Sequence, residues 1–239
     1  MNAELREVLF LDIETVAITD SYQSLDERFK SLWARKASYL RKDESQTDEY
    51  LFNQRAGIYA EFGKVICIGV GKFYQQESGE MVLKTKAYYG NDEKSLLLEF
   101  KGMLDKMDGS VVKLCAHNGK EFDFPYLCRR MLVNEISLPQ ALNLAGKKSW
   151  EVPHIDTMEM WKFGDYKNFT SLELLATIFN IPSSKGGIDG SQVNEVYYKE
   201  SDLPRIKDYC LRDVVVLSQI FLKMRGIIYT SPLTVQEAP

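Results

Sequence analysis

The sequence contains few of the residues that bind zinc. It has two histidines, His117 and His154, and four widely spaced cysteines with no Cys-x-x-Cys pair. Structural zinc sites need several thiolates or imidazoles at close spacing, so the sequence does not predict one. We expect both histidines to have structural roles, and we expect the cysteines to be buried free thiols: Cys67, Cys115, Cys128 and Cys210.

Long apolar runs are also missing. No run approaches the length of about 18 apolar residues that indicates a membrane-spanning helix. Residues 1–7 have neither the basic start nor the apolar run of a signal peptide. We therefore expect a cytoplasmic protein with no membrane partner.

An excess of positive charge is missing as well, because the formal net charge is −4. This balance argues against a protein that coats nucleic acid through a broad electrostatic field. It does not argue against a nuclease, because the carboxylates that bind catalytic metal ions are themselves acidic.

Nucleotide-cofactor motifs are absent too. No G-x-G-x-x-G opens a helix after a strand, and no G-x-x-x-x-G-K-[S/T] occurs, which excludes the common dinucleotide and P-loop enzymes. The chain has 239 residues, of which 45% are hydrophobic and 27% charged, as in an ordinary globular protein. We expect a single domain over residues 1–239, with a core at 7–223 and a charged, partly helical insertion at about 17–62.

The hydrophobic pattern predicts alternating strands and helices. Strands are expected at Val8–Leu11, 64–74, 81–89 and 111–116, with a hairpin turn at Ser78-Gly79. Helices are expected at 91–107, 124–133, from a capping box at 170–173 to Phe179, and from Asp202 to Met224. This order is typical of an α/β protein whose sheet is flanked by helices.

Two carboxylates end the first expected strand. Asp12 and Glu14 are two residues apart, so their side chains point to the same face. Adjacent carboxylates in an apolar strand are costly to bury unless a cation compensates them. A solvated strand end is the alternative, and the D-x-E pattern is weak by itself.

Two further aspartates stand in unusual places. Asp213 follows Tyr209 by four residues, on the same helix face, and precedes the apolar run 214–217. Asp123 lies between an expected strand and an expected helix. Helix packing is the alternative for the first pair, and an N-cap is the alternative for Asp123.

The order of these patterns resembles a known family. D-x-E at Asp12, N-x-x-x-F-D at 118–123 and Y-x-x-x-D at 209–213 resemble the three exonuclease motifs of the DnaQ-like, or DEDD, superfamily. The position of Tyr209, four residues before the last aspartate, resembles the pattern of the DEDDy branch of this superfamily. The DEDDh branch would have a histidine where Asp208 stands. The sequences of residues 122–127 and 209–214 look closest to those of stand-alone bacterial proteins. These proteins are predicted to be 3′→5′ exonucleases related to the exonuclease domain of family B DNA polymerases. The resemblance covers about residues 7–223 and implies a ribonuclease-H-like fold, a mixed sheet flanked by helices.

The resemblance also implies a mechanism. Two divalent ions, Mg²⁺ or Mn²⁺, would be held by four carboxylates during phosphodiester hydrolysis. Asp12 would bridge both ions, Glu14 and Asp213 would serve the ion that holds the attacking water, and Asp123 would serve the other. Tyr209 would orient the water, since a phenol with a pKa near 10 is a poor general base.

Weaker expectations concern the substrate. Phe122 is expected to stack on a terminal base or to pack in the core, Asn118 to bind sugar or phosphate, and Lys185 to contact a phosphate or to be solvated. Asp156 is expected to cap a helix.

The expected partner is nucleic acid with a 3′ end, with single-stranded DNA favoured, and a DNA repair or replication protein is a further candidate. An exoribonuclease on short RNA and a catalytically silent binding module on the same fold stay open as alternatives.

Overall fold

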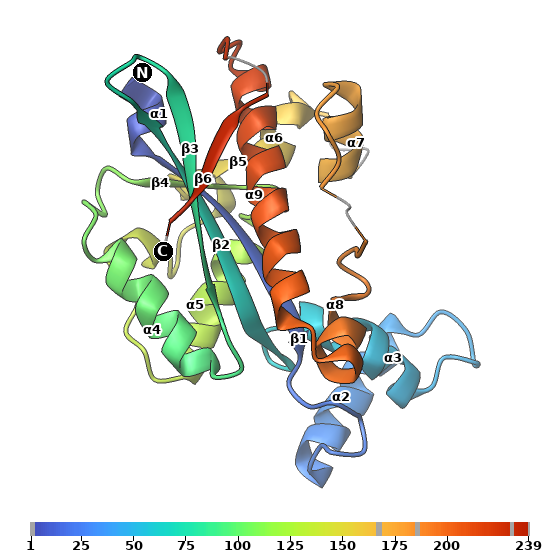
Figure 1. The fold of residues 1–239 in the computed structure, drawn as a ribbon. Coiled ribbons are helices and arrows are strands. Elements are labelled where there is room, and N and C mark those ends of the chain that lie inside the picture. The colour runs from blue at the N-terminus through green and yellow to red at the C-terminus, as the bar shows by residue number, and fades with distance from the viewer. Residues whose placement is uncertain (1–2, 166–168, 185–186, 230–231, 239) are drawn as a thin grey trace.

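The computed structural model describes residues 3–165, 169–184, 187–229 and 232–238. A six-stranded sheet with the order β5-β4-β1-β2-β3-β6 forms its centre (Figure 1). β1, β2 and β3 are antiparallel, whereas the pairs β1–β4, β4–β5 and β3–β6 are parallel. The strands are β1 (Val8–Ala17), β2 (Gly63–Gln75), β3 (Met81–Tyr89), β4 (Lys113–Ala116), β5 (Ile155–Asp156) and β6 (Thr234–Glu237).

Helices cover both faces of this mixed sheet, as the sequence predicts. α4 (Glu93–Leu104) and α5 (Asp123–Val133) lie on one side, and α9 (Leu203–Met224) crosses the other (Figure 1). No helix in the described part of the chain is long and apolar enough to cross a membrane. The remaining helical elements are α1 (Ala3–Glu7), α2 (Glu27–Leu40), α3 (Asp48–Arg55), η1 (Ala56–Ile58), η2 (Gln140–Leu142), η3 (Ser149–Glu151), α6 (Thr157–Lys162), α7 (Leu172–Ile178), α8 (Val193–Glu195) and η4 (Val196–Glu200).

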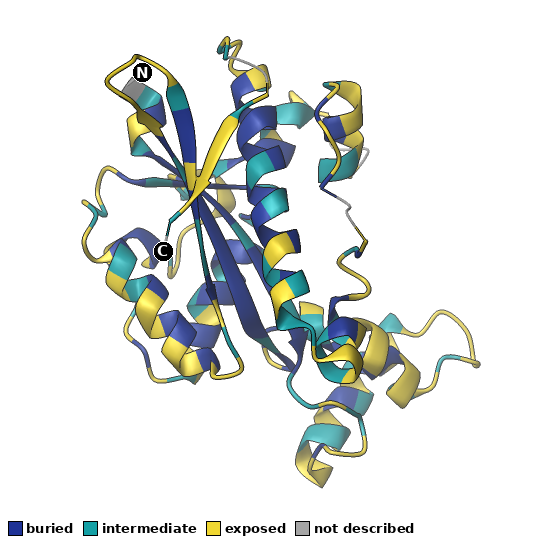
Figure 2. Ribbon diagram, viewed as in Figure 1, coloured by how far each residue is buried: buried dark blue, intermediate teal, exposed yellow. Residues whose placement is uncertain are grey.

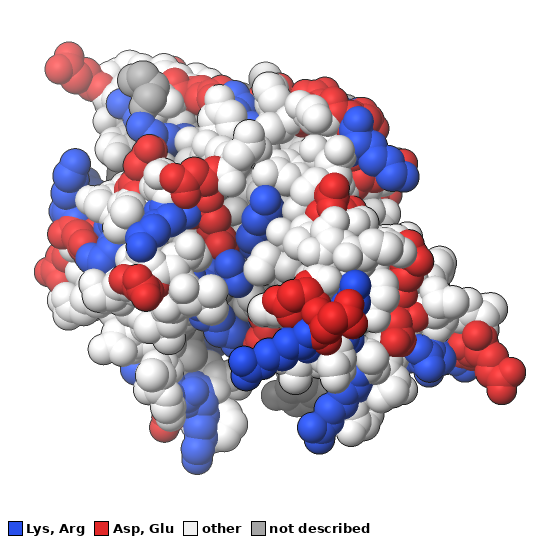
Figure 3. All heavy atoms as spheres, turned by 90° about the horizontal axis from the view of Figure 1, so that it is seen from below, with Lys and Arg blue, Asp and Glu red and all other residues white. Residues whose placement is uncertain are grey.

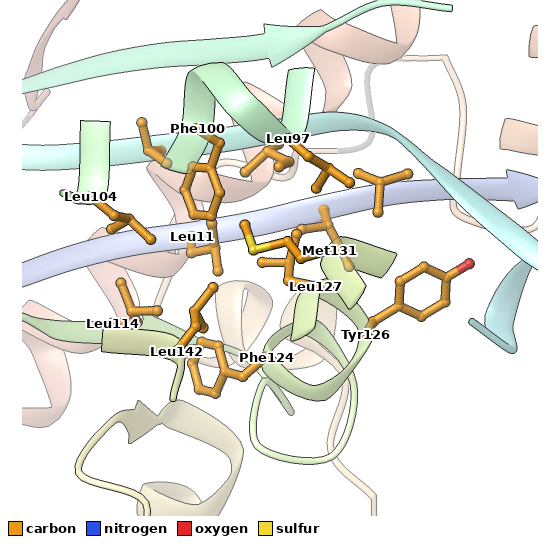
Figure 4. Packing of buried hydrophobic residues seen from close by; sticks show 14 of the residues in the cluster. Leu11, Leu97, Phe100, Leu104, Leu114, Phe124, Tyr126, Leu127, Met131 and Leu142 are labelled. Carbon is orange, nitrogen blue, oxygen red and sulfur yellow. The ribbon is translucent and has the colours of Figure 1, made fainter. Parts of the chain in front are cut away.

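β1 is buried on both faces (Figure 2). Its odd-numbered residues Leu9, Leu11 and Ile13 pack against α4 and α5, in the cluster that Figure 4 shows. Val8 and Phe10 face α9, where the ring centroids of Phe10 and Phe221 are 5.5 Å apart. Each such side chain contributes roughly 1.5–3 kcal/mol when fully buried. The same alternation places Asp12 and Glu14 on the α9 face.

Residues close to one another in the sequence determine where most helices begin. Asp202 accepts a hydrogen bond from the Arg205 backbone N–H at the start of α9, where Pro204 occupies the first turn. One prediction is wrong: the N-cap of α7 is Ser171, whose Oγ accepts from the Leu174 N–H, and not Thr170. The carbonyl of Thr170 instead lies 2.8 Å from Nε2 of His117, a contact that the local sequence does not reveal.

The residues between β1 and β2 form a helical segment, which we call the 18–62 segment. It contains α2, α3 and η1, in agreement with the expected partly helical insertion. Trp33 anchors it, since its ring packs at 5.3 Å from Phe52 and 5.0 Å from Phe62, and its Nε1 donates to the Asp48 carbonyl. These contacts give the segment a small core of its own.

The last strand was not predicted. β6 pairs with β3 beyond the expected end of the core at residue 223, and its four residues are all exposed. A strand with no buried face has no apolar alternation, so the sequence carries no signal for it.

Candidate active site

The D-x-E pair lies in the middle of the sheet, on the face that α9 covers. Asp12 pairs with Gly69 of β2, and Glu14 pairs with Cys67. Glu14 is buried, and Oδ2 of Asp12 is buried with no hydrogen-bond partner among the described residues. A buried carboxylate oxygen without a donor is costly, which marks it as a ligand for something else.

α9 brings three polar side chains close to the carboxylates of β1. Tyr209, Cys210 and Asp213 are buried where the helix faces β1 and β2. Sγ of Cys210 donates to the carbonyl of Asp12 at 3.4 Å, and Tyr209 hydrogen-bonds to the carboxylate of Asp213. In the described part of the chain, ligand atoms of Asp12, Glu14 and Cys210 lie within 4.8 Å of one another.

Two glycines of β2 allow this close approach. A Cβ added at Gly69 would lie 2.9 Å from Sγ of Cys210, and one added at Gly71 would lie 2.7 Å from Cγ1 of Val214. Both distances are too short for ordinary contacts. The helix can therefore reach the carboxylates of β1 only because these positions lack side chains.

Asp123 reaches the site from the start of α5. The N-cap of this helix is Phe122, and Asp123 is the first helical residue, so the N-cap alternative is wrong. Its carboxyl group is buried and interacts with the backbone N–H of Ile13 in β1.

Asp156 holds the loop that precedes Asp123. One of its carboxylate oxygens accepts from the Asn118 N–H at 3.0 Å, and the other accepts from the Lys120 N–H at 3.1 Å. It also accepts from the Met158 N–H as N-cap of α6, which confirms the expected cap. Asp156 therefore both caps a helix and shapes the loop, in which Asn118 has a left-handed φ of 63°.

The carboxyl groups of this site have raised pKa values. For Asp12, burial raises the pKa well above its ordinary value, and the charges of Asp213, Glu14 and Asp123 add to this, in that order. Burial likewise raises the pKa of Glu14 and of Asp213, and it raises that of Asp123 to about 7. The charges of the other candidate acids act on Asp12 and on Glu14, so a cation beside these two would lower the cost of ionising them.

Tyr209 stays protonated at this site. Burial first, and then the charges of Asp213, Glu14 and Asp12, raise the pKa of its phenol above the ordinary value. The hydroxyl is therefore a hydrogen-bond donor and not a base.

An open cleft of about 710 Å³ gives access to these groups. Its wall includes Asp12, Glu14, Tyr209 and Asp213, and also Asn118, whose Oδ1 is buried with no partner among the described residues. Phe122 is only partly buried and lines the cleft, although it also packs 5.4 Å from the ring of Tyr126. Asp123 is not among the described lining residues, and Lys185 lies outside the residues that the structure describes.

Both histidines form hydrogen bonds within the fold, and His117 also lines the cleft. Nδ1 of His154 accepts from the Leu114 N–H and its Nε2 donates to the Ala141 carbonyl, which requires a neutral ring. Nε2 of His117 donates to the Thr170 carbonyl, and its Nδ1 lies 2.9 Å from Oγ1 of Thr157. Of the four free cysteines, three are buried as expected, and Cys128 is only partly buried.

Other lining residues were not anticipated. They come from the 18–62 segment, from the residues before α7 and from the residues before and within α8, and they include polar and aromatic side chains suited to a polar substrate. No periodicity or motif distinguishes them in the sequence. Among them are Asn53, Gln54, Arg55, Ile58, Phe169, Ser191 and Asn194.

The comparisons with known proteins identify the family and the fold. Residues 58–234 match the family described as predicted 3′-5′ exonuclease related to the exonuclease domain of PolB, and the chain belongs to this family. The matched range contains Asp123, Tyr209 and Asp213, whereas Asp12 and Glu14 precede it. No curated protein matches the chain.

The fold is similar to part of a solved polymerase. The family B DNA polymerase from the hyperthermophilic archaeon Pyrobaculum calidifontis superposes with a TM-score of 0.54 at 14% identity, over 90% of this chain. The chain spans 24% of the length of that polymerase. The likeness confirms the expected ribonuclease-H-like fold.

Proposed function

We propose that this protein is a metal-dependent 3′→5′ exonuclease that acts on single-stranded DNA. The observation that carries the proposal is the meeting of Asp12 and Glu14 from β1 with Tyr209 and Asp213 from α9, at the base of an open cleft. Asp123 joins them from the start of α5 through its contact with Ile13. In a family of predicted exonucleases, this set of carboxylates suits phosphodiester hydrolysis.

The donor set fits hard divalent cations. Carboxylate oxygens are the ligands that Mg²⁺ and Mn²⁺ prefer, and the unpaired Oδ2 of Asp12 is available to such an ion. Asp12, Glu14, Asp123 and Asp213 would hold the ions. Cys210 does not fit, because burial raises the pKa of its thiol and Sγ already donates to a carbonyl. When bound, two such ions stabilise charge on the attacking and leaving oxygens and lower the pKa of water.

The protein's own groups position the substrate. The hydroxyl of Tyr209 orients the attacking water, since its raised pKa keeps it a donor. The amide of Asn118 faces the cleft and binds the sugar or phosphate of the terminal nucleotide. Phe122 offers a ring face to a base, a contact worth roughly 1–3 kcal/mol.

Digestion of end-labelled strands tests the proposal. Single-stranded DNA and RNA, each labelled at the 3′ or the 5′ end, would be incubated with Mg²⁺, Mn²⁺ or EDTA. We expect the 3′ label to be released first as a mononucleotide, from DNA in preference to RNA, and only with metal. Preference for RNA would indicate the exoribonuclease, and binding without cleavage would indicate a silent binding module.

A further inference from the structure

The 18–62 segment forms one wall of the candidate cleft. Asn53, Gln54 and Arg55, at the end of α3, line it together with the carboxylates of β1 and α9. Arg55 is exposed and forms no ion pair within the part of the chain that the structure describes. Of the described lining residues it is the only lysine or arginine.

This wall is attached firmly to the helix that carries Asp123. The hydroxyl of Tyr126 donates to the Gly57 carbonyl at 2.8 Å, and Nη1 of Arg130 donates to the Ala60 carbonyl at 2.9 Å. Both donors are buried residues of α5, and Figure 4 shows the Tyr126 hydroxyl pointing away from the apolar cluster. Arg55 is therefore held beside the cleft by the same helix that begins at Asp123.

Among the described residues that line the cleft, Arg55 alone offers a lysine or arginine charge to an anionic substrate. The acidic side chains that line the cleft are those of Asp12, Glu14 and Asp213. Viewed from the end at which α2 and α3 lie, the surface has basic and acidic side chains interspersed, with no basic face (Figure 3). The formal net charge is −4 and this face carries no concentration of basic residues, so a specific cationic contact inside the cleft would contribute to binding a polyanion.

We propose that Arg55 binds a backbone phosphate of the single strand whose 3′ end reaches the carboxylates, so that the 18–62 segment is a substrate-binding wall. A guanidinium suits this task because its planar donors match phosphate oxygens in pairs. Asn53 and Gln54, both exposed beside it, offer hydrogen bonds to the adjoining sugar and bases. The inference rests on the proposed function, and it assigns a substrate contact outside the residues that the family match covers.

The test compares Arg55→Gln with Arg35→Gln. Arg35 is an exposed arginine of α2 that does not line the cleft, and it is the matched control. For cleavage of a short single-stranded DNA, Arg55→Gln should raise KM about tenfold, the scale of one charge-assisted contact, while kcat changes little. Arg35→Gln should match the wild type in KM and kcat.

Binding measured without cleavage separates this inference from the proposed function. Fluorescence anisotropy of the same strand would be followed at several salt concentrations, with Asp213→Asn in every protein. Loss of one phosphate contact should weaken binding about tenfold and reduce the slope of log K against log salt by about 0.7. Arg55→Lys should keep the slope and lose part of the affinity, because the paired contact is lost.

The outcomes distinguish the inference about Arg55 from the proposed exonuclease function. If the wild type cleaves and Arg55→Gln matches Arg35→Gln in KM, affinity and salt slope, the inference is overturned. If the wild type binds through Arg55 without cleaving, the inference stands and the proposed function fails. An absence of both binding and cleavage overturns both, and equal melting temperatures confirm that each variant is folded.

Discussion

Gly69 lies opposite Asp12 in the β1–β2 pair, and Cys210 of α9 contacts both positions. Its Sγ donates to the carbonyl of Asp12 at 3.4 Å and would lie 2.9 Å from a Cβ at Gly69. The missing side chain at Gly69 therefore sets how closely Tyr209 and Asp213 approach the carboxylates of β1.

Gly69→Ala should displace α9 and impair catalysis. Overpacking of this kind costs roughly 1–3 kcal/mol of unfolding free energy, and the shift should reduce activity more than the lost stability explains. Gly102→Ala in α4 is the control, because an added Cβ there meets nothing within 4 Å; it should leave activity unchanged and stabilise the helix by roughly 0.5–1 kcal/mol. The measurements are melting temperature and cleavage rate, and wild-type rates in Gly69→Ala would contradict the spacing argument.

Asp213→Asn should abolish most of the activity while the protein stays folded. The amide keeps the volume but removes a charged ligand, and loss of such an electrostatic stabiliser costs about 10²–10³ in rate. Tyr209→Phe should be milder, because it deletes one orienting hydroxyl and leaves the carboxylates in place. Single-turnover cleavage and melting temperature should be measured on the same preparations, and a wild-type rate for Asp213→Asn would refute the proposed role.

Divalent metal should stabilise the protein after EDTA treatment. An ion that binds only the native state at a hundredfold excess over Kd adds about 2.7 kcal/mol to the unfolding free energy. The melting temperature should therefore rise with Mg²⁺ or Mn²⁺, and it should rise much less in Asp12→Asn. A wild-type melting temperature that does not respond to either ion would argue against the metal site.

Acid should remove a stabilising contribution that His154 makes near neutral pH. Burial lowers the pKa of its imidazole from 6.5 to about 4. Below pH 6.5 the unfolded chain therefore binds a proton at this ring, whereas the native protein does so only as the pH approaches 4. The stabilisation is complete above pH 6.5 and is lost as the pH falls toward 4, about 3 kcal/mol in all. Between pH 7 and pH 5 the unfolding free energy of the wild type, measured by denaturant unfolding, should fall by about 2 kcal/mol relative to that of His154→Asn. The buried carboxyl groups with raised pKa values contribute in the opposite direction, but they are present in both proteins and cancel in this difference. An equal pH dependence in both proteins would refute the assignment.

Arg130→Met should be strongly destabilising. Arg130 lies 2.6 Å from the carboxylate of Glu93 in a pair that is almost fully buried, and its loss would leave that carboxylate without its cation. Breaking a buried pair in this way costs about 3–5 kcal/mol. Lys199→Ala, which breaks the exposed pair with Glu195, should change the unfolding free energy by less than about 1 kcal/mol. Chemical denaturation measures both, and similar effects would show that burial is not the cause.

Local patterns predicted the main elements well. The strand expected at 81–89 is β3, and the strand expected at 64–74 lies within β2. Alternation in β1 also predicted that Asp12 and Glu14 share a face. These features depend on side-chain periodicity and capping groups within a few residues of each other, which the sequence displays directly. The cap predicted at Thr170 is instead Ser171, and the carbonyl of Thr170 contacts His117, which is distant in sequence.

The sequence by itself therefore determined the elements, the order of the carboxylates and the family resemblance. Only the tertiary structure decided that α9 approaches β1 at Gly69, that Asp123 contacts Ile13 and that Arg55 lines the cleft. The strand β6 is a further case, since it pairs with β3 through backbone hydrogen bonds and buries no side chain. The physical reason is common to all four: each relationship joins residues far apart in the chain through close packing or backbone contacts, and no periodic pattern encodes such a contact.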